Sequence, residues 1–175
     1  MQKGEGQKLV ADAMLVKMAR WLRLFGVSVK EIKYKNDKMI LAYVKRNDAT
    51  LLTCDRTAYQ MARKRRIGCI FIPNMDFDHQ LAYVFKALGR APKINRLRCT
   101  LCNRQIMPIS KSFAKSHNTP ANALRQNNKF YYCSACKKIY WHGSHWVHIR
   151  KRAWRVKDIL SSRPILGSLP QPRPR

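Results

Sequence analysis

Two Cys-x-x-Cys pairs, Cys99 with Cys102 and Cys133 with Cys136, have the spacing of zinc ligands. Each pair can supply two thiolates from one turn, and four thiolates complete the tetrahedral shell of a structural Zn²⁺ ion. The alternatives are disulfide bonds, which a reducing compartment would disfavour, and four free thiols, which the paired spacing disfavours. Because sulfur would fill all four positions, no position remains for a reacting water. We therefore expect this zinc to stabilise the chain rather than to catalyse a reaction.

Carboxylates are scarce and are concentrated in the first half of the chain. The sequence has nine Asp+Glu against 36 Lys+Arg, and only Asp158 of the nine acids follows Arg90. Four of the acids come at or soon after the end of a predicted strand, and these are Asp12, Asp37, Asp55 and Asp76. Each could instead be an ordinary helix cap or turn residue.

The elements around these aspartates predict an α/β fold. Short apolar runs over residues 9–12, 27–32, 49–54 and 68–73 alternate with helical patterns over 13–26, 37–45, 55–66 and 76–89. Such alternation is typical of a parallel sheet flanked by helices, with ligands bound outside the carboxyl ends of its strands. All four aspartates would then share that edge. Clustered carboxylates suit Mg²⁺ or Mn²⁺, and such an ion beside a phosphodiester would activate water for hydrolysis.

The net charge of +27 points to a polyanionic partner. Nucleic acid is favoured, because neutralising phosphates releases counterions, and a membrane surface is the weaker alternative. The chain has no apolar run of membrane-spanning length and its N-terminus lacks a signal-peptide core, so we expect a cytoplasmic protein without a membrane partner. Aromatic residues after the second cysteine pair could stack on bases or form a small core.

The composition changes near Arg90 and again near residue 150. We predict one domain over residues 8–90, a zinc ribbon over 96–150, and a basic extension over 151–175. The extension begins with "KRAWRVKDILSS", which could form a helix from about Lys151, and ends as the Pro/Arg-rich segment "RPILGSLPQPRPR".

Several of these segments together resemble the Mut-seven C-terminal RNase domain family, in which a PIN-like nuclease domain precedes a zinc ribbon. The similarity covers roughly residues 8–150. It is carried by "ADAMLVKMARWLRLFG", "LLTCDR", "DHQLAYVFKALG", "RCTLCN" and "YYCSACKKIYWHGSHW". Cys54 stands where that family usually has arginine. Asp12, Asp37 and Asp55 match the family's acidic positions, while Asp76 or the nearby Asp78 matches a fourth.

The resemblance implies a metal-dependent ribonuclease that uses Mg²⁺ or Mn²⁺ at Asp12, Asp37, Asp55 and Asp76, with Zn²⁺ in the ribbon. The cationic and aromatic residues that we expect to contact RNA are Lys17, Arg20, Arg56, Arg63, Lys137, Lys138, His145 and Trp146. The alternative is a non-catalytic RNA-binding protein, associated with ribosomal RNA or the ribosome, that keeps the nuclease fold.

Overall fold

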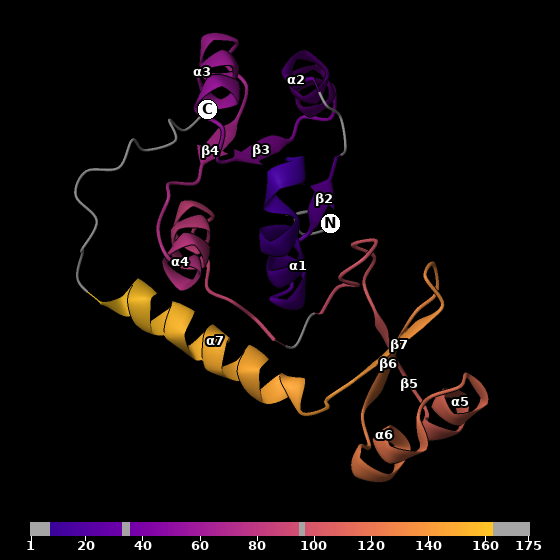
Figure 1. Cartoon of the computed structure of the whole chain (residues 1–175). Helices are drawn as coiled ribbons and strands as arrows, with labels where there is room; N and C mark the ends of the chain where they lie inside the picture. Colours follow the sequence, from indigo (N-terminus) through magenta and orange to yellow (C-terminus); the bar gives the residue numbers. More distant parts are fainter. Residues whose placement is uncertain (1–7, 33–35, 95–96, 163–175) are drawn as a thin grey trace, which may run out of the picture.

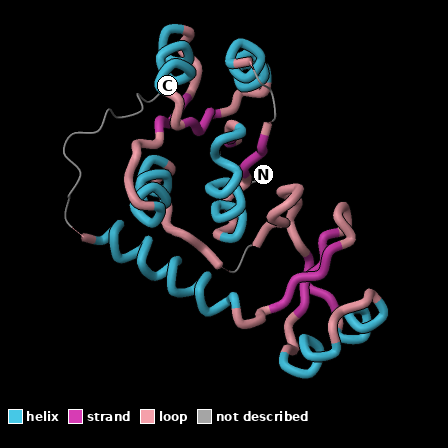
Figure 2. Tube along the Cα trace, viewed as in Figure 1, coloured by secondary structure: helices cyan, strands magenta, loops and turns pink. Residues whose placement is uncertain are grey.

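Four short strands form a parallel sheet in the order β2-β1-β3-β4 (Figures 1 and 2). The computed structural model describes residues 8–32, 36–94 and 97–162. The strands are β1 (Leu9–Ala11), β2 (Val29–Glu31), β3 (Thr50–Thr53) and β4 (Cys69–Phe71). The central pair β1 and β3 aligns Ala11 with Leu52, so the two strands end side by side.

Helices cover both faces of this sheet, as predicted. They are η1 (Ala13–Leu15), α1 (Val16–Leu24), α2 (Asp37–Arg46), α3 (Arg56–Lys64) and α4 (Phe77–Ala87). Successive strand residues point to opposite faces. Ala11 and Leu52 accordingly pack in one core with residues of α1 and α4, whereas Val10 and Leu51 pack in the other with residues of α2 and α3. The predicted α/β class with a parallel sheet is confirmed.

The second half begins with a three-stranded antiparallel sheet in the order β5-β6-β7. Its strands are β5 (Met107–Ile109), β6 (Phe130–Cys133) and β7 (Lys138–Trp141), and two short helices lie between β5 and β6, α5 (Lys111–Ser116) and α6 (Ala121–Gln126). The sequence between the cysteine pairs had little periodicity because these helices bury few residues. Ala114 and Ala123 are their buried side chains.

A long final helix, α7 (His145–Ser161), returns to the first domain and packs beside α4 (Figure 1). It begins at His145, earlier than the predicted start near Lys151, because its buried face already includes Trp146 and Ile149. That face continues through Ala153 and Val156 into the core shared with α1 and α4. One helix therefore crosses residue 150, where the extension was predicted to begin. None of the described helices is long and apolar enough to span a bilayer.

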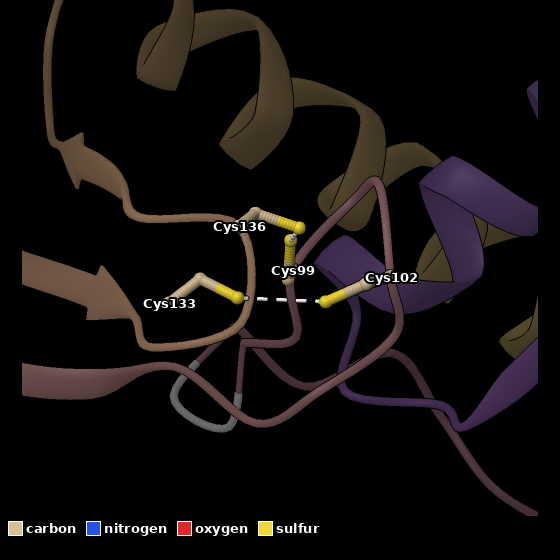
Figure 3. Close-up of side chains that lie close together, drawn as sticks. All are labelled: Cys99, Cys102, Cys133 and Cys136. Atoms are coloured by element: carbon tan, nitrogen blue, oxygen red, sulfur yellow. Dashed lines mark hydrogen bonds between the residues drawn. The ribbon is translucent and has the colours of Figure 1, made fainter.

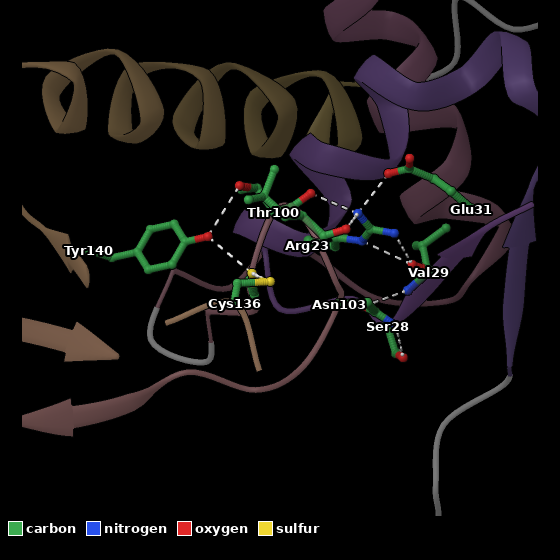
Figure 4. Close-up of polar contacts among 10 residues, drawn as sticks. Arg23, Ser28, Val29, Glu31, Thr100, Asn103, Cys136 and Tyr140 are labelled. Atoms are coloured by element: carbon green, nitrogen blue, oxygen red, sulfur yellow. Dashed lines mark hydrogen bonds and ion pairs between the residues drawn. The ribbon is translucent and has the colours of Figure 1, made fainter. Parts of the chain in front are cut away.

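Arg23 joins the first domain to the ribbon (Figure 4). Its side chain is 2% exposed and pairs with Glu31 at 2.6 Å. The guanidinium also donates to the carbonyl oxygen of Val29 and to the carbonyl oxygen of Thr100, in the first cysteine turn, at 2.7 Å. On the same contact, Asn103 accepts from the Val29 N–H and donates to Ser28. The first cysteine turn is thus fixed against the end of α1 and the start of β2.

Candidate active site and metal centre

The structure places the four predicted aspartates after the carboxyl ends of the four parallel strands. Asp12, Asp55 and Asp76 are the N-cap residues of η1, α3 and α4, and their carboxylates accept hydrogen bonds from the first backbone N–H groups of those helices. Asp37 is the first residue of α2, where Asn36 is the N-cap. Helix capping therefore explains the position of three of them, but it does not explain why Asp12 is buried.

Asp12 and Asp55 lie together at the centre of the edge, because β1 and β3 are neighbours. A buried hydroxyl connects them: Thr53, fully inaccessible to solvent, is a hydrogen-bond partner of the Asp12 carboxylate. The Thr53 hydroxyl also accepts from the Asp55 N–H at 3.0 Å. Thr53 was not among the residues predicted from the sequence, although its place between β3 and Asp55 was the signal that could have identified it.

The environment of Asp12 disfavours its negative charge. Only 7% of the residue is exposed. Burial raises the pKa of Asp12, and the nearby Asp55 charge adds to that effect, although hydrogen bonds from Thr53 and from the backbone N–H groups of Met14 and Leu15 oppose it. A divalent cation between two such carboxylates would neutralise both. Two carboxylates with waters are a common ligand set for Mg²⁺, so this pair fits the predicted ion.

Asp37 and Asp76 flank this central pair, because they follow the outer strands β2 and β4. The Asp76 carboxylate is exposed and contacts the His79 ring. Although burial opposes it, hydrogen bonds from the His79 N–H and ring, together with the charge of that ring, lower the pKa of Asp76. Among the described residues, no group of three Asp, Glu, His or Cys side chains outside the four cysteines is close enough to share one ion.

Asp78, the competitor for the fourth acidic position, has a different role. It accepts from Arg152 of α7 at 2.5 Å and lies 3.6 Å from Arg155. The Arg152 guanidinium also lies over the Trp21 ring, 4.3 Å from its centroid. Asp78 therefore helps to dock α7 on the first domain, which leaves Asp76 as the more exposed of the two carboxylates after β4.

Two of the predicted phosphate-binding cations lie in the first turns of helices that follow the aspartate pair in sequence. Lys17 is in the first turn of α1, 4.4 Å from the Phe77 ring centroid, and Arg56 is the first residue of α3. Arg20 follows Lys17 by less than one turn, and it is exposed. Arg63 is in the last turn of α3, at the opposite end of that helix from Asp55.

The four cysteines form the second site (Figure 3). Their sulfur atoms all lie within 4.8 Å of one another. The Cys99 and Cys136 sulfurs are 3.8 Å apart, and those of Cys102 and Cys133 are 3.4 Å apart. A tetrahedral ion with Zn–S bonds of about 2.3 Å requires sulfurs about 3.8 Å apart. The cluster therefore fits the predicted zinc.

Hydrogen bonds favour the thiolate at Cys99. Burial opposes ionisation there, but bonds from the Tyr140 hydroxyl, at 3.1 Å, and from the N–H groups of Cys102 and Leu101 outweigh it and lower the pKa of Cys99 to about 6. Thiolate is the form that ligates zinc. By contrast, burial raises the pKa of Cys69 to about 12, as expected for a thiol that packs in the core.

The ribbon residues that we expected to contact RNA differ in exposure. Lys137, Lys138 and His145 are exposed. Trp146 is 7% exposed and its ring stacks on that of His142, with centroids 4.0 Å apart. Trp146 is therefore part of the core between the ribbon and α7.

Comparison with known proteins agrees with the resemblance in the sequence. No curated protein and no solved structure matches the chain. The family model described as the Mut7-C RNAse domain matches residues 7–153, which include the aspartate edge, the cysteine cluster and the first half of α7. The chain belongs to the Mut7-C RNase domain family.

Proposed function

We propose that the protein is a metal-dependent ribonuclease whose metal is held by Asp12 and Asp55 at the centre of the aspartate edge. The observation that carries this proposal is the pair itself: a buried carboxylate beside a second carboxylate, joined through the Thr53 hydroxyl. Such an arrangement is unfavourable without a cation. The family of the chain is that of an RNase domain, which supports RNA as the substrate.

The roles follow from the placement of each group. A Mg²⁺ or Mn²⁺ ion bound there would activate water and stabilise the leaving oxygen of a phosphodiester. Thr53 orients the Asp12 carboxylate and the backbone of Asp55. Lys17 and Arg56 neutralise the phosphates of the bound strand. Asp37 and Asp76 lie on either side of the Asp12 and Asp55 pair along the sheet edge.

The test compares cleavage of a labelled single-stranded RNA by the wild type, Asp12→Asn and Asp55→Asn, in Mg²⁺ and in Mn²⁺. Asparagine is as good a helix cap as aspartate, so both substitutions remove charge while the caps remain. We expect cleavage to fall by about 100-fold or more in both variants, with RNA affinity retained. Asp78→Asn is the matched control, since its carboxylate binds Arg152 and should not be needed for cleavage.

RNA binding without turnover is the second candidate, and the net charge of +27 favours it. An acid-poor second half suits a protein bound along structured RNA, including the RNA of a ribosome. The same experiment separates the two functions. Tight binding by all four proteins with no cleavage by any of them would reject the nuclease and leave the binding protein.

A further inference from the structure

A partly open cavity of about 300 Å³ lies between the ribbon sheet and the first turns of α7. This volume is at the lower end of the range of about 300–1,000 Å³ found for small-molecule pockets. Its walls are mainly apolar and rich in rings, which are those of Tyr131, Tyr140, Trp141, His142 and Trp146. None of them belongs to the aspartate edge or to the zinc ligands. Flat walls of this kind suit a flat ligand.

His142 contributes a buried ring nitrogen to the lining of this cavity. Its ring lies between two others, 4.0 Å from Trp146 with an interplanar angle of 12°, and 5.6 Å from Tyr131. The Nε2 atom is buried, and no hydrogen-bond partner for it exists among the described residues. A buried polar nitrogen without a partner is unfavourable, so a ligand that supplies the missing hydrogen bond would be favoured.

Two cations line the same cavity, and no carboxylate does. They are Arg98, which is half-buried, and Lys138, whose Nζ lies 5.7 Å from the Tyr140 ring centroid. One Arg98 N–H donates to the Asn103 carbonyl oxygen at 2.9 Å, which holds that side chain beside the cavity. Positive charge at the margin of an aromatic pocket is suited to a ligand with a planar ring system and an anionic group.

We propose that this cavity binds one nucleotide of an RNA strand. The base stacks among the rings and its edge hydrogen-bonds to His142 Nε2, while Arg98 and Lys138 lie on the side of its phosphate. Aromatic side chains hold unpaired bases by stacking, largely without regard to sequence. The identity of the ligand as part of an RNA substrate rests on the proposed function, but the binding itself requires neither the aspartates nor a divalent ion.

The experiment uses the zinc-loaded full chain without Mg²⁺ or Mn²⁺, titrated calorimetrically with AMP, GMP, CMP and UMP. The test variant is His142→Phe, which keeps a ring between Tyr131 and Trp146 but removes Nε2. His117→Phe is the matched control. His117 is the other stacked histidine of the ribbon, 3.9 Å from the Phe113 ring, and it lies outside the cavity.

We expect the wild type and His117→Phe to bind at least one of the four mononucleotides saturably, and His142→Phe to bind it about tenfold more weakly. The melting temperature of His142→Phe should not fall, because the substitution removes an unpaired buried nitrogen. A role of His142 in structure alone predicts unchanged nucleotide binding, so this pair of readouts separates the two.

Three results would overturn the proposal. They are no saturable binding of any mononucleotide to the wild type, equal binding by His142→Phe, and equally tight binding of ribose 5-phosphate, which lacks the base. None of them depends on cleavage. Mononucleotide binding that persists while Asp12→Asn and wild type show the same lack of RNA cleavage would reject the nuclease and keep the pocket.

Discussion

The cysteine cluster and the aspartate edge are both candidate metal sites, but the chain assembles them differently. The four sulfurs already lie within 4.8 Å of one another. The four carboxylates share a sheet edge, and only Asp12 and Asp55 are neighbours. Burial raises the pKa of Cys133, and hydrogen bonding to Cys102 raises that of Cys136, so both stay protonated and do not repel the Cys99 thiolate, whereas carboxylates at neutral pH repel one another. The cysteine side chains can therefore cluster without a bound ion. The distances between the carboxylates are set by the backbone that carries them, because the charges repel one another.

This difference separates the roles of the two ions. A preformed four-sulfur cluster at a domain contact contributes to folding. In the proposed function, the carboxylate pair would instead hold an ion that takes part in the chemistry. The two regions should consequently respond in opposite ways when ligands or ions are removed.

Zinc removal should have the largest effect on stability. The denatured wild type should release one Zn²⁺ per chain, and Cys133→Ser should release much less. Zinc contributes on the order of 10 kcal/mol to the folding of small zinc modules, so Cys133→Ser should lose the ribbon fold, followed by circular dichroism and tryptophan fluorescence. Asp12→Asn, by comparison, should not lower the melting temperature, because burial and Asp55 already disfavour the Asp12 charge. A zinc-free wild type with an unchanged melting curve would contradict this prediction.

Arg23 tests whether the ribbon is held by the zinc alone or also by the first domain. Lysine keeps the charge but cannot reach Glu31 and the carbonyl oxygens of Val29 and Thr100 together. We expect Arg23→Lys to lower the free energy of unfolding by about 2–3 kcal/mol, as measured by urea denaturation. Arg20→Lys on the exposed face of the same helix is the control and should change little. Equal stabilities of the two variants would show that the Arg23 contact is dispensable.

The parts of the molecule that sequence could predict are those governed by local pattern. The alternation of strand and helix patterns predicts the parallel sheet. In such a sheet, the residues that follow the strands lie along one edge, so the pattern also places the aspartates together. The cysteine spacing predicted the cluster directly. Apolar periodicity at Trp146, Ile149 and Ala153 extends through the actual start of α7, but the adjacent Gly-Ser-His segment obscured it.

The parts that sequence could not predict depend on contacts between distant segments. Arg23 resembles the exposed cations around it, and only the position of Thr100 makes it a buried connector. The sequence alone does not distinguish Asp76 from Asp78. They differ because Arg152, 74 positions after Asp78, binds the Asp78 carboxylate. The cavity around His142 likewise depends on the contact between the ribbon sheet and the first turns of α7, which line it together.

Substitutions of Thr53 test whether its hydroxyl holds Asp12 and Asp55 in the geometry needed to bind a metal ion. Thr53→Val keeps the shape of this fully buried side chain but loses its bonds to Asp12 and to the Asp55 N–H. We expect a loss of about 1–2 kcal/mol in stability and a higher Mg²⁺ or Mn²⁺ concentration for half-maximal cleavage. Thr53→Ser keeps the hydroxyl, so it should reach half-maximal cleavage at the same metal concentration as the wild type. If Thr53→Val is less stable but has a wild-type metal dependence, Thr53 is only a packing residue.

The smallest expected effect concerns the backbone that closes the cysteine cluster. The residue after each Cys-x-x-Cys pair has a positive φ, 66° at Asn103 and 52° at Lys137. This left-handed conformation costs a residue with a side chain about 1 kcal/mol, a cost that glycine avoids. We therefore expect Lys137→Gly to raise the free energy of unfolding by about 0.5–1 kcal/mol, measured by urea denaturation of the zinc-loaded chain.

Asn103→Gly makes the same backbone change in the other turn, but with the opposite expected sign. Its side chain bonds to the Val29 N–H and to Ser28, and two such bonds contribute about 0.5–1.5 kcal/mol each. The loss of both should exceed the relief of strain, so Asn103→Gly should be less stable than the wild type. Stabilisation by both substitutions would mean that strain alone dominates the two turns. A divided result would instead show that the first turn is shaped by its contacts with Ser28 and Val29, whereas the second is shaped by zinc geometry alone.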